Sequence, residues 1–144
     1  MSRRSRAREV VLQVLYEDDL NPSRNPAVAD EFVQKRLHRD PSLVEFAAML
    51  LSGTRRHRPE LDRLLAETAA NWSLARMAVT DRNVLRLGAF EILHTDTPRR
   101  VAINEAVELA RRFGTRQSAQ FVNGILDKFM QERRESTRKD DGLV

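Results

Sequence analysis

The chain has 144 residues, of which 41 % are hydrophobic and 32 % are charged, and it contains no cysteine. A chain of this length forms one ordinary domain, or two small subdomains that share a core, and it buries enough surface to fold without disulfides or metals. Thiolate chemistry, zinc–thiolate sites and iron–sulfur clusters are therefore excluded, and the lack of cysteine fits a reducing compartment.

The apolar and charge patterns narrow the class further. No apolar run is long enough for a membrane span, and no such run follows the basic start Met1–Arg6 as a secretory signal requires. We therefore expect a cytoplasmic protein without a membrane segment. Arginine outnumbers lysine by 22 to 3 within a net charge of +4. Guanidinium groups bind phosphate oxygens and stack on bases, so this bias favours a phosphate-rich partner, although codon composition explains it equally well.

The periodicity of apolar residues predicts an all-α fold. Apolar residues recur at a spacing of three and four, and no window keeps the strict alternation of a strand. The first predicted helix, about 4–19, buries a stripe that includes Val11 and Leu15 and presents Gln13 and Tyr16 on the opposite face. Asparagine–proline pairs end this helix and precede the second.

Prolines and glycines mark the limits of the later helices. The third helix begins at Pro41 and is the most apolar, so we expect it to be central. Thr80 is the expected N-cap of the fifth. Glycine within a helix costs up to ~1 kcal/mol, so Gly88 and Gly124 predict close contacts between helices. In order, the seven predicted helices span about 4–19, 27–39, 41–58, 59–71, 80–94, 98–113 and 118–134.

The break between the fourth and fifth helices suggests two helical subdomains, about 1–71 and 72–134, within a single domain of residues 1–134. Residues 135–144 carry no apolar periodicity. We expect them to form a disordered, solvated tail.

Candidate catalytic groups are few. The residues His38, His57 and His94 lie at helix ends or in a basic run, and we interpret them as surface or capping residues. Glu105 and Glu108 are spaced for a shared proton-transfer site, but a solvated helix face is the more usual origin of such a pair. No glycine-rich phosphate loop is present. The sequence therefore predicts no enzyme activity, no cofactor and no metal site.

The amino terminus carries the clearest binding signal. Four arginines, Arg3, Arg4, Arg6 and Arg8, precede the first acidic residue at the start of a predicted helix. Cations there oppose the helix dipole at a cost of roughly 0.3–1 kcal/mol each, so helix stability does not explain them. A bound phosphate backbone explains them, and Gln13 and Tyr16 would add hydrogen bonding and base stacking. The alternative is a solvated basic terminus, with Tyr16 packed on a neighbouring helix.

Four ordered blocks of sequence resemble the NusB family of transcription antitermination factors. The resemblance covers about residues 4–129. The blocks are Arg6-Ala-Arg-Glu9 with Gln13, Leu15 and Tyr16; Asp81-Arg-Asn-Val-Leu-Arg86; Val101-Ala-Ile-Asn-Glu-Ala-Val-Glu-Leu-Ala110; and Phe121-Val-Asn-Gly-Ile-Leu-Asp127.

This resemblance implies an all-helical adaptor that binds the boxA segment of nascent ribosomal RNA. It also implies a partner, the ribosomal small-subunit protein NusE, and assembly with other Nus factors on RNA polymerase. Tyr16 and Asp81 would lie at or near the NusE surface. The implied RNA-binding residues are Arg4, Arg6, Arg8, Gln13, Phe113, Gln117 and Phe121.

Three alternatives remain open on sequence alone. Phe121 lies beside the apolar stripe of its helix, so its ring either packs in the core or stacks on a base. The chain could instead be a protein-interaction scaffold whose RNA affinity arises mainly with NusE. It could also be a homodimer that masks its own RNA site.

Overall fold

The computed structural model describes residues 2–142, with side chains described for residues 2–133. All regular structure in that range is helical, which confirms the predicted all-α fold. The elements are α1 (Arg3–Leu20), α2 (Pro26–Arg36), α3 (Pro41–Arg56), α4 (Arg58–Thr68), the 3-10 turn η1 (Leu74–Arg76), α5 (Val79–His94), α6 (Arg99–Phe113) and α7 (Ser118–Gly142).

Local capping explains where the first three helices begin. The Ser2 hydroxyl accepts a hydrogen bond from the Ser5 N–H at 3.0 Å. The Asn25 side chain caps α2 in the same way, and the Asp40 carboxylate caps α3, where Pro41 occupies the first turn. The N-cap predicted at Thr80 is wrong: the N-cap of α5 is Ala78, which follows η1 and an extended Met77, so the helix begins at Val79.

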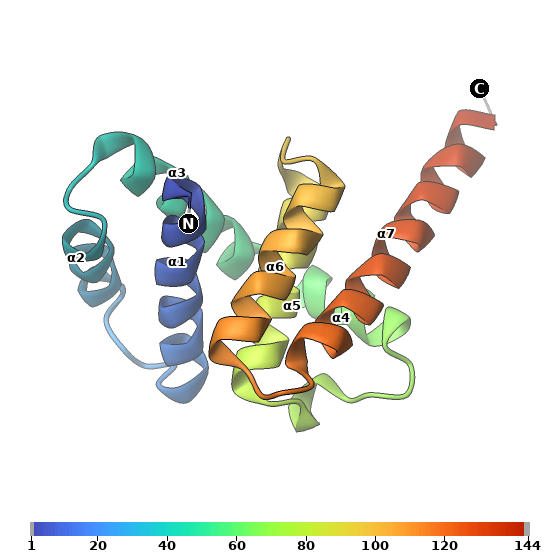
Figure 1. Cartoon of the computed structure of the whole chain (residues 1–144), viewed down its shortest axis with the longest axis horizontal. Coiled ribbons are helices and arrows are strands. Elements are labelled where there is room, and N and C mark those ends of the chain that lie inside the picture. The colour runs from blue at the N-terminus through green and yellow to red at the C-terminus, as the bar shows by residue number, and fades with distance from the viewer. Residues whose placement is uncertain (1, 143–144) are drawn as a thin grey trace.

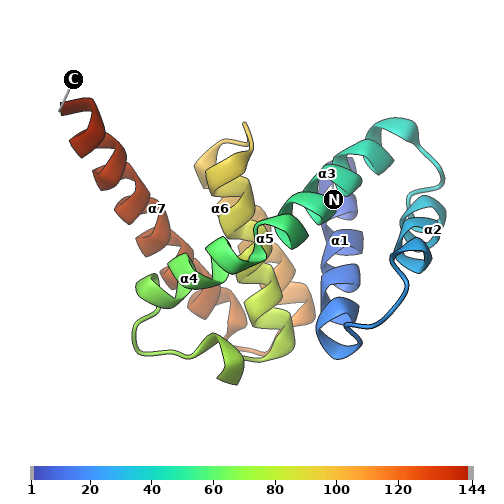
Figure 2. The same ribbon diagram turned by 180° about the vertical axis from the view of Figure 1, so that it is seen from behind.

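The central helix is α5. It lies among α1, α3, α4, α6 and α7 and packs against all five (Figures 1 and 2). Residues 83–92 are all buried, so this helix is enclosed along its whole circumference. The prediction that the third helix is central is therefore wrong. Although α3 is more apolar, it keeps an exposed face that includes Met49, whereas α5 buries polar side chains that find partners on other helices. Apolar content alone does not measure how many neighbours a helix has.

One continuous apolar core contains buried residues from both predicted subdomains. Helix α4, expected in the first subdomain, also packs against α5 and α7. The division near residue 71 stays a prediction.

Close helix contacts occur at two glycines. A Cβ atom added to Gly88 would lie 2.7 Å from the Leu126 Cδ1 atom, which confirms the contact predicted there. A Cβ on Gly53 of α3 would overlap the Phe90 ring of α5. The contact predicted at Gly124 is wrong, because that position faces open space.

Helix α7 ends later than predicted. It buries Val122, Leu126 and Phe129 and then continues to Gly142, and its end projects away from the other helices (Figure 1). Glutamate, arginine and lysine in this segment are good helix formers, and Gly142 is the first strong helix breaker. The predicted disordered tail is thus helical backbone as far as residue 142, and residues 143–144 lie outside the described range. None of the helices in residues 2–142 is long and apolar enough to cross a membrane.

Candidate nucleic-acid interface

A stripe of polar and aromatic residues runs along α1. Arg6, Glu9, Gln13 and Tyr16 share one face, because they are spaced at three and four along the helix. The end of α6 lies beside this stripe, and Arg112 forms an ion pair with Glu9. We call this surface the α1–α6 face; it consists of Arg6, Glu9, Gln13, Tyr16, Arg112 and Phe113.

The exposed arginines at the start of α1 have partial charge compensation. Arg3 pairs with Asp40, and Arg6 donates a hydrogen bond to Glu9 at 3.1 Å. The Arg4 guanidinium lies 4.4 Å above the centre of the Phe46 ring, a cation–π contact that leaves its charge free to attract an anion. These positions keep three guanidinium groups at the surface.

Arg8 does not fit the predicted RNA surface. Its side chain is buried, and it makes two hydrogen bonds to the Glu91 carboxylate, at 2.7 and 2.8 Å. Glu105 lies 3.7 Å from the same guanidinium. Burial alone would lower the pKa of Arg8, but the hydrogen bond and charge of Glu91, with the charge of Glu105, raise it above its ordinary value. A buried, paired guanidinium is an internal link between α1 and α5 and is not available to a phosphate.

A groove with a volume of about 600 Å³ brings three predicted residues together. Gln13 and Tyr16 of α1 and Phe113 of α6 line it. Tyr16 and Phe113 are 37 % and 40 % exposed, so their ring faces are accessible to a ligand. The Gln13 Oε1 atom is buried and accepts no hydrogen bond from any described residue.

Several residues that sequence reasoning missed also line or adjoin this groove. The basic residues Arg24 and Arg36 line the groove. The Arg36 guanidinium carbon lies 5.7 Å from the centre of the Phe32 ring. Arg112 was missed although it stands directly before Phe113 in the sequence. The Arg111-Arg112-Phe113 triplet at the end of a helix could have indicated Arg112. No local sequence pattern could have indicated Arg24 and Arg36, because they reach the groove through the way α2 packs.

The remaining predicted residues form a second group. Asp81, Gln117 and Phe121 line a hollow of about 230 Å³ between the starts of α5 and α7, together with Trp72. Trp72 is 60 % exposed, and its ring meets the Phe121 ring edge-on at 5.2 Å. The structure therefore does not place Asp81 in the same groove as Tyr16. Phe121 is half-buried and also packs on the core, so the missed Trp72 offers the more exposed ring.

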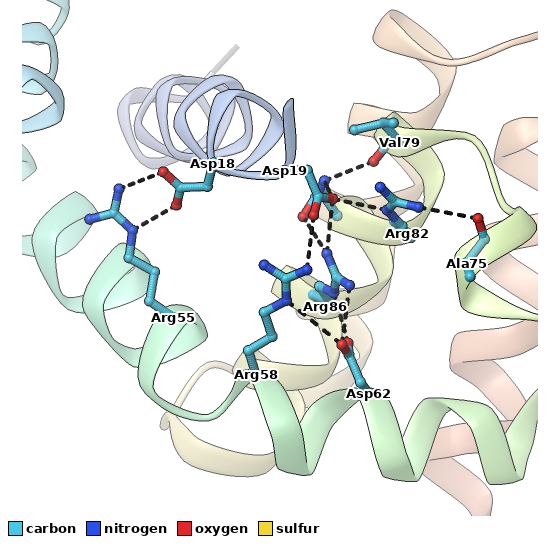
Figure 3. A network of polar contacts seen from close by, with 10 residues as sticks. Asp18, Asp19, Arg55, Arg58, Asp62, Ala75, Val79, Arg82 and Arg86 are labelled. Carbon is cyan, nitrogen blue, oxygen red and sulfur yellow. Dashed lines mark hydrogen bonds and ion pairs between the residues drawn. The ribbon is translucent and has the colours of Figure 1, made fainter. Parts of the chain in front are cut away.

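An ion-pair network holds α1 in position (Figure 3). Asp18 makes two hydrogen bonds with Arg55 of α3, at 2.7 and 2.9 Å. Asp19 joins α1 to α4 and α5, and Asp62 extends the network by binding Arg86. The partners of Asp19 are Arg58 at 2.9 Å, Arg82 at 2.9 Å, Asn83 at 2.7 Å and Arg86 at 3.0 Å.

The environment of Asp19 favours its ionised form. Burial alone would raise the pKa of this carboxyl, but hydrogen bonds from Arg82 and Asn83 and the charges of Arg86 and Arg82 outweigh it and lower the pKa to about 2. The block Asp81–Arg86, identified through the family resemblance, therefore supplies three side chains that anchor the end of α1. This anchor positions Tyr16 and Gln13 against Phe113.

The histidines are surface or capping residues as predicted, because His94 is exposed and His57 occupies the cap position of both α3 and α4. His38 is exposed, but the rings of His57 and His94 are stacked 4.0 Å apart and both lie close to Glu60. Glu60 was overlooked, although it follows His57 at a spacing of three. No local pattern indicates that the end of α5 brings His94 beside the junction of α3 and α4.

The two carboxylates considered for proton transfer bind different partners. Glu105 accepts hydrogen bonds from the Ser5 hydroxyl at 2.8 Å, whereas Glu108 pairs with Arg111. Each carboxylate thus has its own structural or surface contact.

Comparison with known proteins identifies the family. The sequence model described as the NusB family matches residues 5–131. The chain is 42 % identical over 127 residues to the transcription antitermination protein NusB of Anaeromyxobacter dehalogenans, covering 88 % of this chain and 89 % of that protein. It is 42 % identical over 132 residues to the protein of the same name from Myxococcus xanthus, covering 89 % and 94 %.

Solved structures agree with the sequence comparison. NusB of T. maritima is 35 % identical and superposes with a TM-score of 0.80, covering 92 % of both chains. A chain from a crystal structure of the antitermination factors NusB and NusE in complex with dsRNA is 26 % identical, with a TM-score of 0.76, covering 92 % of this chain and 98 % of that one. By sequence and by structure, the chain belongs to the NusB family.

Proposed function

We propose that this chain is a transcription antitermination factor that binds boxA RNA of nascent ribosomal transcripts together with NusE. In this role it joins the antitermination complex on RNA polymerase with other Nus factors. Family membership supports this function, as does structural similarity to the NusB chain of a NusB–NusE–RNA complex. The observation that carries it is the groove in which Gln13, Tyr16 and Phe113 meet.

The chemistry of the α1–α6 face suits an unpaired nucleic-acid strand. Exposed aromatic rings stack on bases, and guanidinium groups bind the backbone phosphates between those bases. Phe113 offers such a ring, and the Arg112 guanidinium lies 5.7 Å from its centre. Arg6 is a second guanidinium group on this face. Glu9 holds both guanidinium groups in place through ion pairs, and a phosphate would compete for them.

The predicted site residues take two roles within this proposal. The RNA would contact Arg4, Arg6, Gln13 and Phe113, with Arg112 added and Arg8 removed because it is buried. Gln117 and Phe121 would extend RNA binding toward the second hollow, and Tyr16 and Asp81 would lie at the edge that NusE covers. The homodimer considered from the sequence stays a prediction.

The proposed adaptor acts without catalysis and works in the cytoplasm, where nascent transcripts are made. The separate ion-pair and hydrogen-bond partners of Glu105 and Glu108 support the absence of a shared proton-transfer site.

The experiment measures binding of fluorescent single-stranded boxA RNA, and of a scrambled RNA, by anisotropy. The chain is titrated alone and with equimolar NusE. We expect the pair to prefer boxA by at least about tenfold, and Phe113→Ala to reduce that binding because a stacked base is worth about 1–3 kcal/mol. Equal affinity for both RNAs, with and without NusE, would refute the function. Selectivity only in the pair would indicate a scaffold whose RNA affinity arises in the complex.

A further inference from the structure

Two histidines and one glutamate meet at a corner of the fold, away from the α1–α6 face. His57 is the single residue between α3 and α4, Glu60 lies in the first turn of α4, and His94 is the last residue of α5. The His94 Nε2 atom lies 2.6 Å from the Glu60 Oε1 atom, and the His57 Nδ1 atom lies 3.8 Å from the same oxygen. All three donor atoms lie within 4.8 Å of one another.

These distances suit a shared metal ion. Zinc binds imidazole nitrogen at about 2.0–2.1 Å and carboxylate oxygen at about 2.0–2.2 Å, so tetrahedral ligand atoms lie about 3.3 Å apart. The present separations bracket that value. The His57 and His94 ring planes are nearly parallel, and each nitrogen lone pair lies in its ring plane, so the rings have to turn before both nitrogens point at one ion. The three side chains are between 30 % and 41 % exposed, so they have room to turn, an ion can enter, and water can complete the coordination.

Phe90 supports both imidazoles from the protein interior. The His57 and His94 rings are stacked with an angle of 19° between their planes, and both contact the Phe90 ring. Phe90 is itself wedged against Gly53, so the rings rest on a buried support.

The nearest charged groups are occupied elsewhere. Glu91, one turn before His94, is buried in the ion pair with Arg8 and is not a fourth ligand. Arg63, whose charge reaches Glu60, pairs with Glu67 at 3.6 Å, and Arg58 pairs with Asp19. The donor atoms available to a metal ion at this corner are therefore those of His57, Glu60 and His94.

We propose that His57, Glu60 and His94 form a binding site for one divalent transition-metal ion, with zinc as the best match. Two imidazoles and one carboxylate prefer zinc, nickel or copper over magnesium and calcium, which favour sites made only of oxygen ligands. The ion replaces the direct contact between Glu60 and His94 and joins the α3–α4 junction to the end of α5. Because it binds only the folded chain, it stabilises the fold by mass action.

The test titrates ZnCl₂ into the full chain without a histidine tag, after treatment with a chelator, and follows heat by calorimetry. We expect one zinc ion per chain and a Tm that rises with free zinc, whereas MgCl₂ has neither effect. Replacing a ligand by His57→Ala, Glu60→Gln or His94→Ala should weaken zinc binding by at least about tenfold. The matched control is His38→Asn, an exposed histidine outside the cluster at a positive φ that asparagine tolerates.

A second measurement uses only the unaltered chain, so it does not depend on whether the variants fold. In the unaltered chain, zinc should shift the imidazole NMR resonances of His57 and His94 and leave those of His38 unchanged. The proposal is overturned if zinc does not bind, if His38 is the resonance that shifts, or if the folded His57→Ala and His94→Ala variants bind zinc as the unaltered chain does.

Discussion

Arg8 and Glu91 form a buried ion pair between α1 and α5, with 3 % and 1 % of their surfaces exposed. A pair of this kind is weak evidence for added stability, since both charges lose their hydration. Removing only one partner is different, because the other charge then stays buried without compensation. The role of Arg8 is therefore structural, in contrast to that of its exposed neighbours Arg4 and Arg6.

The variant Arg8→Ala should lower the free energy of unfolding by about 3–5 kcal/mol, because Glu91 loses its partner in the core. Urea denaturation measures this loss. Arg6→Ala, which removes a partly exposed arginine from the same helix, should cost no more than about 1 kcal/mol. Equal stability of the Arg8→Ala variant and the unaltered chain would mean that the ion pair is not formed in solution.

At the scale of helices, packing depends on where backbones approach closely. The edge of the Phe90 ring occupies the space beside Gly53, so α3 and α5 are held close together. Gly124 faces open space although it too lies within a helix. The two glycines therefore form a matched pair for testing the packing of helices.

The variant Gly53→Ala should destabilise the fold, because overpacking costs about 1–3 kcal/mol and exceeds the gain of up to ~1 kcal/mol in helix propensity. Gly124→Ala should instead stabilise the fold by up to ~1 kcal/mol. Thermal unfolding of both variants measures the signs. Two variants with Tm changes in the same direction would contradict the close approach of α3 and α5.

The network around Asp19 makes stability depend on pH. Its pKa of about 2 in the folded chain lies below the ordinary value of 3.8, so ionised Asp19 contributes stability above about pH 4. That contribution, about 2 kcal/mol, is lost as the pH falls from about 4 to 2.

We therefore expect Asp19→Asn to be less stable than the unaltered chain at neutral pH. The difference between their free energies of unfolding should shrink below pH 4, as the unaltered chain takes up a proton on Asp19. Urea denaturation at a series of pH values measures this difference. A constant difference from pH 6 to 2.5 would show that Asp19 does not hold the lowered pKa.

For the whole molecule, features set by neighbouring residues could be predicted from the sequence, whereas contacts between distant helices could not. Helix number, most helix starts and the apolar stripes could be predicted, because caps, prolines and periodicity act over a few residues. The burial of Arg8 could not, since its partner Glu91 is 83 positions away. The meeting of Gln13 with Phe113, and of His57 with His94, depends likewise on how distant helices pack. Gln13 and Tyr16 were predicted from the pattern of the first helix, whereas Phe113 was named through resemblance to a family, and spacing alone would not have joined it to them.

The central claim is that the exposed arginines at the start of α1 bind the RNA backbone beside the α1–α6 face. The most direct measurement is the salt dependence of boxA RNA binding, in the presence of NusE, for the double variant Arg4→Ala/Arg6→Ala. Its matched control is Arg63→Ala/Arg100→Ala, which removes two exposed arginines elsewhere. The log–log slope should fall by about 0.7 for each phosphate that the first variant no longer binds, and it should stay unchanged in the control. An unchanged slope in the first variant, or an equal fall in the control, would contradict the claim.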